Sequence, residues 1–78
     1  MGRTPKKLPA AVEMGERIRV RRRSLKLSQE ELAERSGFHP TYVSSVERGE
    51  RNVTLMTILR LAHALEIDPG RFVRGLHP

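Results

Sequence analysis

Residues 28–49 read SQEELAERSGFHPTYVSSVERG, and this stretch predicts two short helices joined by a glycine turn. Ser28 and Glu31 have the S-x-x-E spacing of a capping box, in which two unpaired backbone N–H groups at a helix start are satisfied reciprocally. Gly37 suits the left-handed backbone conformation that often follows a helix end. We therefore predict the first of the two helices over residues 29–36.

The second helix of this stretch has two different sides. Pro40 fits the first helical position, His39 precedes it as a cap, and Gly49 marks the end. At about 100° per residue, one side carries Tyr42, Val43, Val46 and Glu47, and the other carries Thr41, Ser44, Ser45 and Arg48. We expect the first side to pack inward. The second side is either an ordinary solvated helix face or a surface that meets a ligand.

The segment before this stretch predicts another helix, from Val12 to about Lys26. Its apolar stripe consists of Met14, Ile18 and Leu25, and Arg22 lies on the same stripe. A buried arginine needs a carboxylate partner, because an unpaired buried charge is costly. We expect the structural ion pair Arg22–Glu47, because Glu47 lies on the inward side of the helix that follows Pro40.

Two further helices are predicted downstream. Thr54 caps the first of them, and its apolar stripe consists of Leu55, Ile58, Leu59, Ala62 and Leu65. Asp68-Pro69 starts a last short helix with the apolar residues Phe72, Val73 and Leu76. No segment alternates between apolar and polar residues with a period of two, so no sheet is expected. The sequence thus predicts one compact all-α domain of five helices over residues 11–78.

Basic residues are concentrated in the first third of the chain. The net charge is +6; residues 1–26 hold nine Lys or Arg and two acidic residues, whereas residues 27–78 hold six and seven. This asymmetry predicts a polyanionic partner, either nucleic acid or an anionic membrane surface, unless the cluster only keeps the protein soluble. Residues 1–10 predict a flexible basic tail, which is either an arm that lies on DNA or an ordinary disordered terminus.

Several function classes are disfavoured by what the sequence lacks. It has no cysteine, and its three histidines lack ligand spacing, so we expect no disulfide, metal or other cofactor. No nucleophile–base spacing or glycine-rich phosphate loop points to catalysis, so we expect no catalytic residues and no enzyme. No apolar run has membrane-spanning length, and no signal peptide follows the start. We therefore expect a cytoplasmic protein. A core this small favours dimerisation.

The quoted stretch has the helix-turn-helix arrangement, in which the second helix enters the DNA major groove. Residues 28–65, SQEELAERSGFHPTYVSSVERGERNVTLMTILRLAHAL, resemble the helix-turn-helix domain of phage lambda-type repressors and Cro proteins, and the resemblance covers about residues 12–76. TYVSSVERGERNVTL (41–55) resembles in particular the controller proteins of restriction–modification systems, small dimers that regulate transcription of the modification, controller and restriction genes. The resemblance implies a lambda-repressor-like fold of five helices and a symmetric homodimer on a pseudo-palindromic operator in double-stranded DNA.

The resemblance also implies which residues contact bases. Thr41 and Ser45 match base-reading positions, Ser44 shares their side of the helix, and His39 and Pro40 occupy the two preceding contact positions. Pro40 departs from the glutamine or arginine of many relatives and offers only apolar contact, for example to a thymine methyl group. Controller relatives use the arginine that matches Arg51 for a base contact, so Arg51 is expected at a guanine or at a phosphate.

Other residues are expected at the DNA backbone. Gln29 matches the glutamine that binds a phosphate in repressors, and its backbone N–H lies at an anion-friendly helix N-terminus. Arg48 is expected at a phosphate, with Asn52 close by. The hydroxyl of Tyr42 is expected at a sugar-phosphate, unless its ring packs in the core. Arg22 and Glu47 match the buried ion pair of the family.

The family places its dimer contact near the fourth and fifth helices. Phe72, Val73 and Leu76 are therefore dimer candidates, although an intramolecular core explains them equally well. A different class of function is a protein-interaction module of the same fold, as in antitoxins and coactivators. Antitoxins bind their partner through an extension of the chain, and because the sequence ends at Pro78, directly after the fifth predicted helix, we expect DNA to be the ligand instead.

Overall fold

The computed structural model describes residues 8–78, which form five helices. Helix α1 spans Pro9–Ser24, α2 Gln29–Ser36, α3 Pro40–Glu47, α4 Leu55–Ala64 and α5 Gly70–Val73. Since no strand lies among the described residues, the predicted all-α class and the five helices are confirmed. The expected tail, residues 1–10, falls largely outside the described part of the chain.

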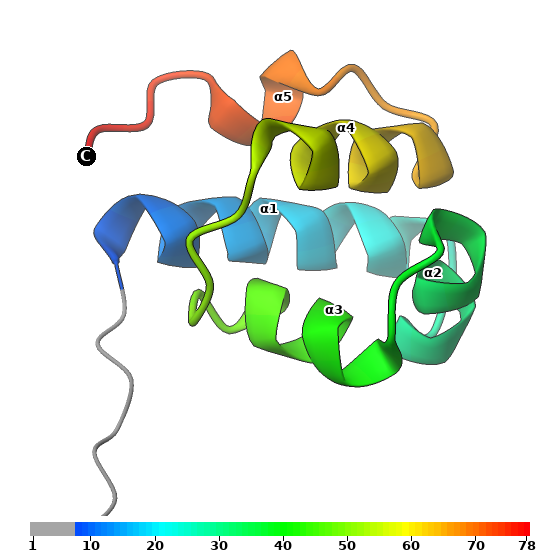
Figure 1. The fold of residues 1–78 in the computed structure, drawn as a ribbon. Helices are drawn as coiled ribbons and strands as arrows, with labels where there is room; N and C mark the ends of the chain where they lie inside the picture. The colour runs from blue at the N-terminus through cyan, green and yellow to red at the C-terminus, as the bar shows by residue number, and fades with distance from the viewer. Residues whose placement is uncertain (1–7) are drawn as a thin grey trace, which may run out of the picture.

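Helix α1 runs through the middle of the molecule, between α4 and α5 on one side and α2 and α3 on the other (Figure 1). It packs against α3 and α5, while α2 packs against α3 and α4. The largest fully buried side chains come from every helix or its end: Ile18, Leu32, Val43, Val46, Leu61, Leu65 and Phe72. The helix-turn-helix pair α2–α3 is therefore fixed to the rest of the fold by a shared core.

Helix α1 is displaced from its predicted bounds at both ends. It begins at Pro9 instead of Val12, because a proline at the first helical position already has a helical φ and lacks only an N–H that would be unpaired there. It ends at Ser24, and Lys26 adopts the left-handed conformation, with φ of 59°. A left-handed residue commonly follows a helix end, but it is usually glycine. Because Lys26 stands where a glycine would be expected, the sequence did not indicate the end of α1.

The predicted capping box is present at the start of α2. Ser28 Oγ accepts a hydrogen bond from the Glu31 backbone N–H at 3.0 Å, and Glu31 Oε1 accepts one from the Ser28 backbone N–H at 2.8 Å. This bond from the Ser28 backbone lowers the pKa of Glu31 below its usual value, because it favours the charged carboxylate. At the other end of α2, Gly37 has a φ of 76°, as its predicted role requires.

An arginine from α4 fixes the turn between α2 and α3. Arg60 donates to the Ser36 carbonyl oxygen from Nε at 3.1 Å and from Nη2 at 2.8 Å, and Nη2 also donates to the Gly37 carbonyl at 3.1 Å. Its guanidinium carbon lies 4.1 Å from the centre of the Phe38 ring. Arg60 thus satisfies carbonyl groups that a helix end leaves unpaired, and it adds a cation–π contact at the turn.

Helices α1 and α3 approach each other closely at Gly15. A Cβ atom placed on this residue would lie 2.5 Å from the carbonyl oxygens of both Val46 and Glu47. Carbon–oxygen contacts of this length are strongly repulsive, so only glycine permits this spacing. A glycine inside a predicted helix does not reveal which element comes close to it, so the close approach at Gly15 was not predicted.

The predicted inward stripe of α4 is only partly right. Ala62 and Leu65 are buried and Ile58 is half-buried, but Leu55 is 69% exposed and Leu59 is 38% exposed. Apolar residues occur around most of this helix, so their periodicity alone does not decide which side faces the core. The exposed residues form a separate apolar surface, described below.

Candidate nucleic-acid interface

Three polar side chains, Thr41, Ser44 and Arg48, line the outer side of α3. Thr41 and Arg48 are exposed and Ser44 is half-buried. Their spacing of three and four residues places them one above another on the same helix face. At the start of α3, His39 Nδ1 accepts a hydrogen bond from the Thr41 backbone N–H at 3.1 Å, so His39 caps the helix as expected. In the neutral ring, Nε2 then carries the proton and can donate it to a ligand.

Ser45 does not lie on this exposed surface, contrary to its predicted place on the outer side of the helix. The residue is 5% exposed. Its Oγ donates to the Tyr42 carbonyl oxygen at 2.8 Å and accepts from Arg51 Nε at 3.0 Å. Ser45 is buried together with the inward residues of α3, and Arg51 from the following loop lies against its hydroxyl.

Tyr42 packs between the core and Arg51. Its ring centre lies 5.0 Å from that of Phe38, and its hydroxyl oxygen is 3.3 Å from Thr57 Oγ1. The guanidinium carbon of Arg51 lies 5.5 Å from the centre of the same ring. Of the two roles considered for Tyr42, core packing describes its ring, and its hydroxyl already has a partner within the fold.

The structure contains the expected ion pair between α1 and α3. Arg22 Nε and Nη2 donate to Glu47 Oε2 and Oε1 at 2.7 and 3.0 Å, and the two residues are only 7% and 8% exposed. Arg22 Nη1 also donates to the Leu27 carbonyl at 2.7 Å. The hydrogen bond to Glu47 raises the pKa of Arg22 above its usual value, because it favours the charged guanidinium.

Gln29, the expected phosphate ligand, is attached to this ion pair. Its Nε2 donates to Glu47 Oε1 at 3.0 Å, so Glu47 connects α1, the first residue of α2, and α3. The side chain of Gln29 is half-buried, and its backbone N–H lies in the first turn of α2. Backbone N–H groups in a first helical turn lack intrahelical partners and attract anions.

Arg48, another expected phosphate ligand, is held by neighbours on its own segment. Its Nε and Nη2 donate to the two carboxylate oxygens of Glu50, each at 3.1 Å, and its Nη1 donates to Ser44 Oγ. The hydrogen bond to Glu50 raises the pKa of Arg48. The guanidinium is nevertheless exposed. Asn52, expected near the DNA backbone, is exposed in the loop that follows.

A groove of about 780 Å³ separates α1 from the outer side of α3. Arg19 and Arg23 line it from α1, Ser44 and Arg48 line it from α3, and Gln29 lines it from the start of α2. The Arg23 side chain is exposed and makes no hydrogen bond to residues 8–78. Three glutamates, Glu13, Glu16 and Glu47, line the same groove, and Arg19 lies 3.7 Å from the Glu16 carboxylate. The exposed guanidinium of Arg23 can attract a phosphate backbone.

Arg19 and Arg23 were not singled out from the sequence, which showed only that α1 is rich in arginine. A signal was available in their spacing. They are four residues apart, and so share one helix face, and neither belongs to the apolar stripe of Met14 and Ile18.

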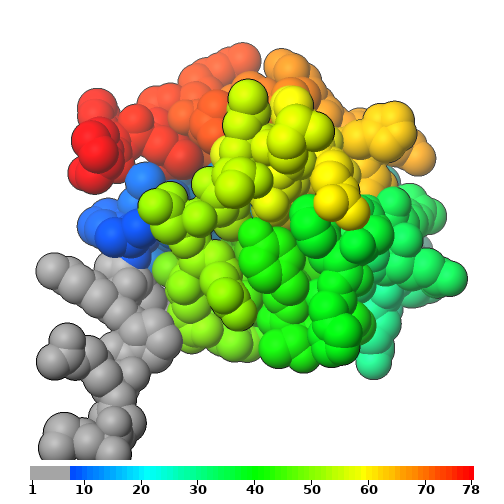
Figure 2. All heavy atoms as spheres, viewed as in Figure 1, coloured from blue at the N-terminus to red at the C-terminus, as the bar shows by residue number. Residues whose placement is uncertain are grey.

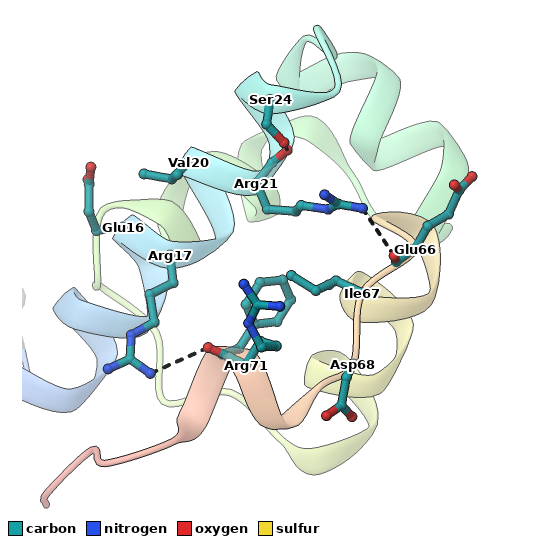
Figure 3. Close-up of a pocket in the computed structure, with 10 residues that line it drawn as sticks. Glu16, Arg17, Val20, Arg21, Ser24, Glu66, Ile67, Asp68 and Arg71 are labelled. Carbon is teal, nitrogen blue, oxygen red and sulfur yellow. Dashed lines mark hydrogen bonds between the residues drawn. The ribbon is translucent and has the colours of Figure 1, made fainter.

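Two other arginines of α1 point away from α3. Arg17 Nη1 donates to the carbonyl oxygens of Arg71 and Arg74 at 3.4 and 2.8 Å, and Arg21 Nη2 donates to that of Glu66 at 3.1 Å. They line a pocket of about 570 Å³ between α1 and the segment from the end of α4 to α5 (Figure 3). Arg17 and Arg21 therefore connect α1 to the C-terminal segment and do not belong to the α1–α3 groove.

The three residues expected at a dimer interface have different environments. Phe72 is 1% exposed and belongs to the core, so its proposed place at an interface is wrong. Leu76 is half-buried against the same core. Val73 is 40% exposed and is the one member of the three that is available for a partner.

Other exposed apolar side chains gather on α4. Leu55, Met56 and Leu59 form what we call the α4 patch, in which Met56 is 62% exposed. Helix α4 stands out on the visible face of the molecule, between the C-terminal segment and α3 (Figure 2). Leu55 and Leu59 were assigned to the inward stripe, which is why the sequence did not reveal this patch as surface.

Two other features are absent from the part of the chain that the structure describes. Within residues 8–78 no three His, Cys, Asp or Glu side chains are grouped so that they would hold a metal ion. In the same range no helix combines the length and apolar character needed to cross a bilayer.

The chain is similar in sequence and in fold to helix-turn-helix proteins. A model of the helix-turn-helix family matches residues 18–72. Control protein C.SmaI of Serratia marcescens is 58% identical over 52 residues, which are 67% of this chain and 62% of the relative. The chain therefore matches less than two thirds of the length of that relative.

Two solved structures are similar in fold and in sequence. The restriction-modification controller protein C.AhdI from Aeromonas hydrophila has a TM-score of 0.81 and 48% identity, covering 83% of this chain and 98% of that chain. The c2 repressor of Salmonella phage P22, in complex with a synthetic operator, has a TM-score of 0.73 and 37% identity, covering 80% of this chain and 94% of that chain.

Proposed function

Because the chain belongs to the helix-turn-helix family, we propose that it is a transcription regulator that binds double-stranded DNA as a symmetric dimer on a pseudo-palindromic operator. Its similarity to control protein C.SmaI and to controller protein C.AhdI favours a role in controlling a restriction–modification system. A regulator of this kind acts on the chromosome or on a plasmid, and so in the cytoplasm.

One observation supports the proposal: polar side chains on the outer side of α3 lie next to arginines that line the α1–α3 groove. Thr41 and Arg48 are exposed on α3, and Arg19 and Arg23 line the groove beside them. An α-helix fits the major groove, and arginines that flank such a helix meet the phosphates on either side. The Arg22–Glu47 pair supports this use, because it fixes α3 relative to α1.

We assign direct base contacts to Thr41, Ser44, His39, Pro40 and Arg51. Thr41 and Ser44 can donate or accept at base edges, and His39 can donate from Nε2. Pro40 offers apolar contact to a thymine methyl group. Few of these side chains discriminate strongly between bases, so Arg51 supplies most of the direct readout, and DNA shape contributes to the rest.

We assign phosphate contacts to Gln29, Arg48, Arg19 and Arg23, with Asn52 at the edge. These contacts add affinity without depending on base sequence. Tyr42 supports the interface from behind, because its ring lies beneath Arg51 and its hydroxyl lies next to Thr57.

The test is a binding measurement with a DNA duplex that the unaltered protein selects from a randomised pool. With about eight phosphate contacts per dimer, the logarithm of the association constant should fall against the logarithm of the salt concentration with a slope of about −7. Affinity that stays flat from low to moderate salt would contradict DNA binding through this surface.

Two variants separate readout from backbone binding. Thr41→Ala should reduce the preference for the selected duplex over a random one by roughly 5-fold or more, because it removes a base contact. Gln29→Ala should weaken both duplexes about equally. A Gln29→Ala protein that loses only its sequence preference would show that Gln29 is not a phosphate ligand.

A further inference from the structure

We propose that Ser45 is a positioning residue that orients Arg51 toward a guanine and does not touch a base itself. The inference rests on the proposed function, because it concerns how this surface distinguishes one DNA sequence from another. In this view Ser45 contributes to sequence specificity through Arg51, whereas the sequence had predicted a direct contact between Ser45 and a base.

The hydrogen bonds of Ser45 define the direction of its interaction with Arg51. A serine hydroxyl has one proton to donate. Ser45 Oγ donates to the Tyr42 carbonyl oxygen at 2.8 Å, and it therefore acts as an acceptor toward Arg51 Nε, at 3.0 Å. The residue is 5% exposed and its single hydroxyl proton is already donated, so donation to a base by Ser45 would require its bond to the Tyr42 carbonyl to break.

A second contact holds Arg51 on another side. Its guanidinium lies over the ring of Tyr42, and that ring is fixed by Phe38 and by the Thr57 hydroxyl. Arginine side chains ordinarily lose much conformational freedom when they bind a ligand. The two contacts at the Arg51 guanidinium already restrict this freedom in the folded protein, before any DNA is bound. Less conformational entropy is then lost on binding, so Arg51 can discriminate more strongly between guanine and other bases.

The two terminal nitrogens of Arg51 are available to donate hydrogen bonds to a guanine. Arg51 is exposed, and its two terminal nitrogens make no hydrogen bond to residues 8–78. Arginine recognises guanine by donating two parallel hydrogen bonds to O6 and N7. With Nε committed to Ser45, the two terminal nitrogens remain to form that pair.

The experiment uses the full chain and the duplex that it selects from a randomised pool. Each guanine of the duplex is replaced in turn by 7-deazaguanine, which lacks the N7 acceptor. At the guanine that Arg51 reads, the replacement should weaken binding by the unaltered protein by about tenfold, because the bidentate contact is reduced to a single hydrogen bond to O6. Arg51→Ala should abolish this sensitivity, and Ser45→Ala should reduce it to about twofold or less, although Arg51 is still present.

A double-variant cycle tests whether the two residues act together. Ser45→Ala and Arg51→Ala should each lower the preference for the selected duplex by a similar factor, and the combined variant should be no worse than Arg51→Ala alone. Ser36→Ala is the matched control. Ser36 is also buried at a helix end and its Oγ bonds the Leu32 carbonyl at 2.7 Å, so it reports the general effect of deleting such a hydroxyl.

A measurement on the unaltered protein avoids any dependence on the folding of variants. NMR relaxation of the Arg51 Nε–H group without DNA should show an order parameter above about 0.6, the range of ordered groups. The Nε–H group of Arg35, which has no hydrogen-bond partner within residues 8–78, should be more mobile. Equal mobility of the two side chains would overturn the inference.

The outcomes distinguish the inference from the proposed function. If the unaltered protein binds every duplex equally, the proposed function itself fails. If it prefers the selected duplex, but Ser45→Ala keeps the full 7-deazaguanine sensitivity or adds independently to Arg51→Ala, the regulator proposal stands and the role of Ser45 is overturned.

Discussion

The carboxylate of Glu47 illustrates how much of this molecule depends on single side chains. It accepts two hydrogen bonds from Arg22 and one from Gln29, and is itself almost fully buried. A buried charge is tolerated only when its partners remain in place. The orientation of α3, for which we propose DNA contact, is therefore tied to a group buried beneath it.

Removing one member of this pair should be more damaging than removing both. Glu47→Leu leaves the Arg22 guanidinium buried without its partner, and should lower the free energy of unfolding by about 3–5 kcal/mol. The combined variant Arg22→Met/Glu47→Leu should recover a large part of that loss, because no charge stays buried. Urea or thermal unfolding followed by circular dichroism measures both values.

An exposed ion pair serves as the control. Glu13→Gln breaks the contact of Glu13 with Arg17, at 3.4 Å on the surface, and should change stability by less than about 1 kcal/mol. If Glu47→Leu costs no more than Glu13→Gln, the buried pair is not important for folding.

The capping box at the start of α2 should contribute a pH-dependent part of the stability. The hydrogen bond from the Ser28 backbone lowers the pKa of Glu31, so the folded state binds the Glu31 proton less readily than the unfolded chain does. This stabilisation is present above the unfolded pKa and is lost as the pH falls through the folded pKa. Thermal unfolding from about pH 6 to pH 2 should therefore show a smaller decline for Glu31→Gln than for the unaltered protein.

Glu34→Gln, on the same helix, controls for the loss of a carboxylate that has no capping role. This variant should retain the decline of the unaltered protein. An identical decline in Glu31→Gln and the unaltered protein would mean that the capping box adds nothing to the pH dependence.

At the scale of residues, the sequence predicted pairings better than exposure. Arg22 and Glu47 were matched correctly, because a charge on an apolar stripe must have an opposite charge nearby. Ser45 was placed on the outer side of its helix, but it is buried and bonded to Arg51 of the following loop. Helical periodicity describes a single helix and contains no information about what a neighbouring segment places over it.

At the scale of elements, the helix starts that carry a capping side chain were predicted accurately. Ser28, His39 and Thr54 all cap helices as their positions suggested. Where glycine supplies the left-handed residue, as at Gly37, the end was also found. After α1 and α4 that conformation is adopted by Lys26 and Glu66, which do not mark a helix end in sequence.

The contact between α1 and α3 provides a test at this scale. Gly15→Ala would place a methyl group against two backbone carbonyls and force the helices apart, at a cost of about 1–3 kcal/mol. Alanine is the better helix former, so a loss of stability must come from packing and not from helix propensity. Denaturant unfolding measures the change.

Glu16→Ala is the neighbouring control, since Glu16 is exposed and alanine there adds nothing to the contact. Its effect should stay within about 0.5 kcal/mol, as for most surface substitutions. A Gly15→Ala protein as stable as Glu16→Ala would show that α1 and α3 can separate at little cost.

At the scale of the whole molecule, the α4 patch predicts where a second copy binds. Leu55→Glu/Met56→Glu would place two like charges in an apolar interface of each protomer, and should convert a dimer to a monomer in sedimentation experiments. Affinity for the selected duplex should fall by more than tenfold, because two half-sites would no longer be bound together.

Val20→Glu is the matched control on a different surface. Val20 is 58% exposed on α1, where it lines the pocket between α1 and the C-terminal segment. This variant should remain dimeric. If Val20→Glu dissociates the dimer and Leu55→Glu/Met56→Glu does not, the dimer interface lies on α1 and not on α4.

The absence of a side chain at Gly15 has a consequence for protein engineering. Because the main chains of α1 and α3 are in direct contact at this residue, the tilt of α3 does not depend on the identity of the side chains on its outer side. A library randomised at Thr41, Ser44 and Arg51 would therefore sample new target sequences on one constant backbone, and any change of preference among its members would be attributable to the substituted residues.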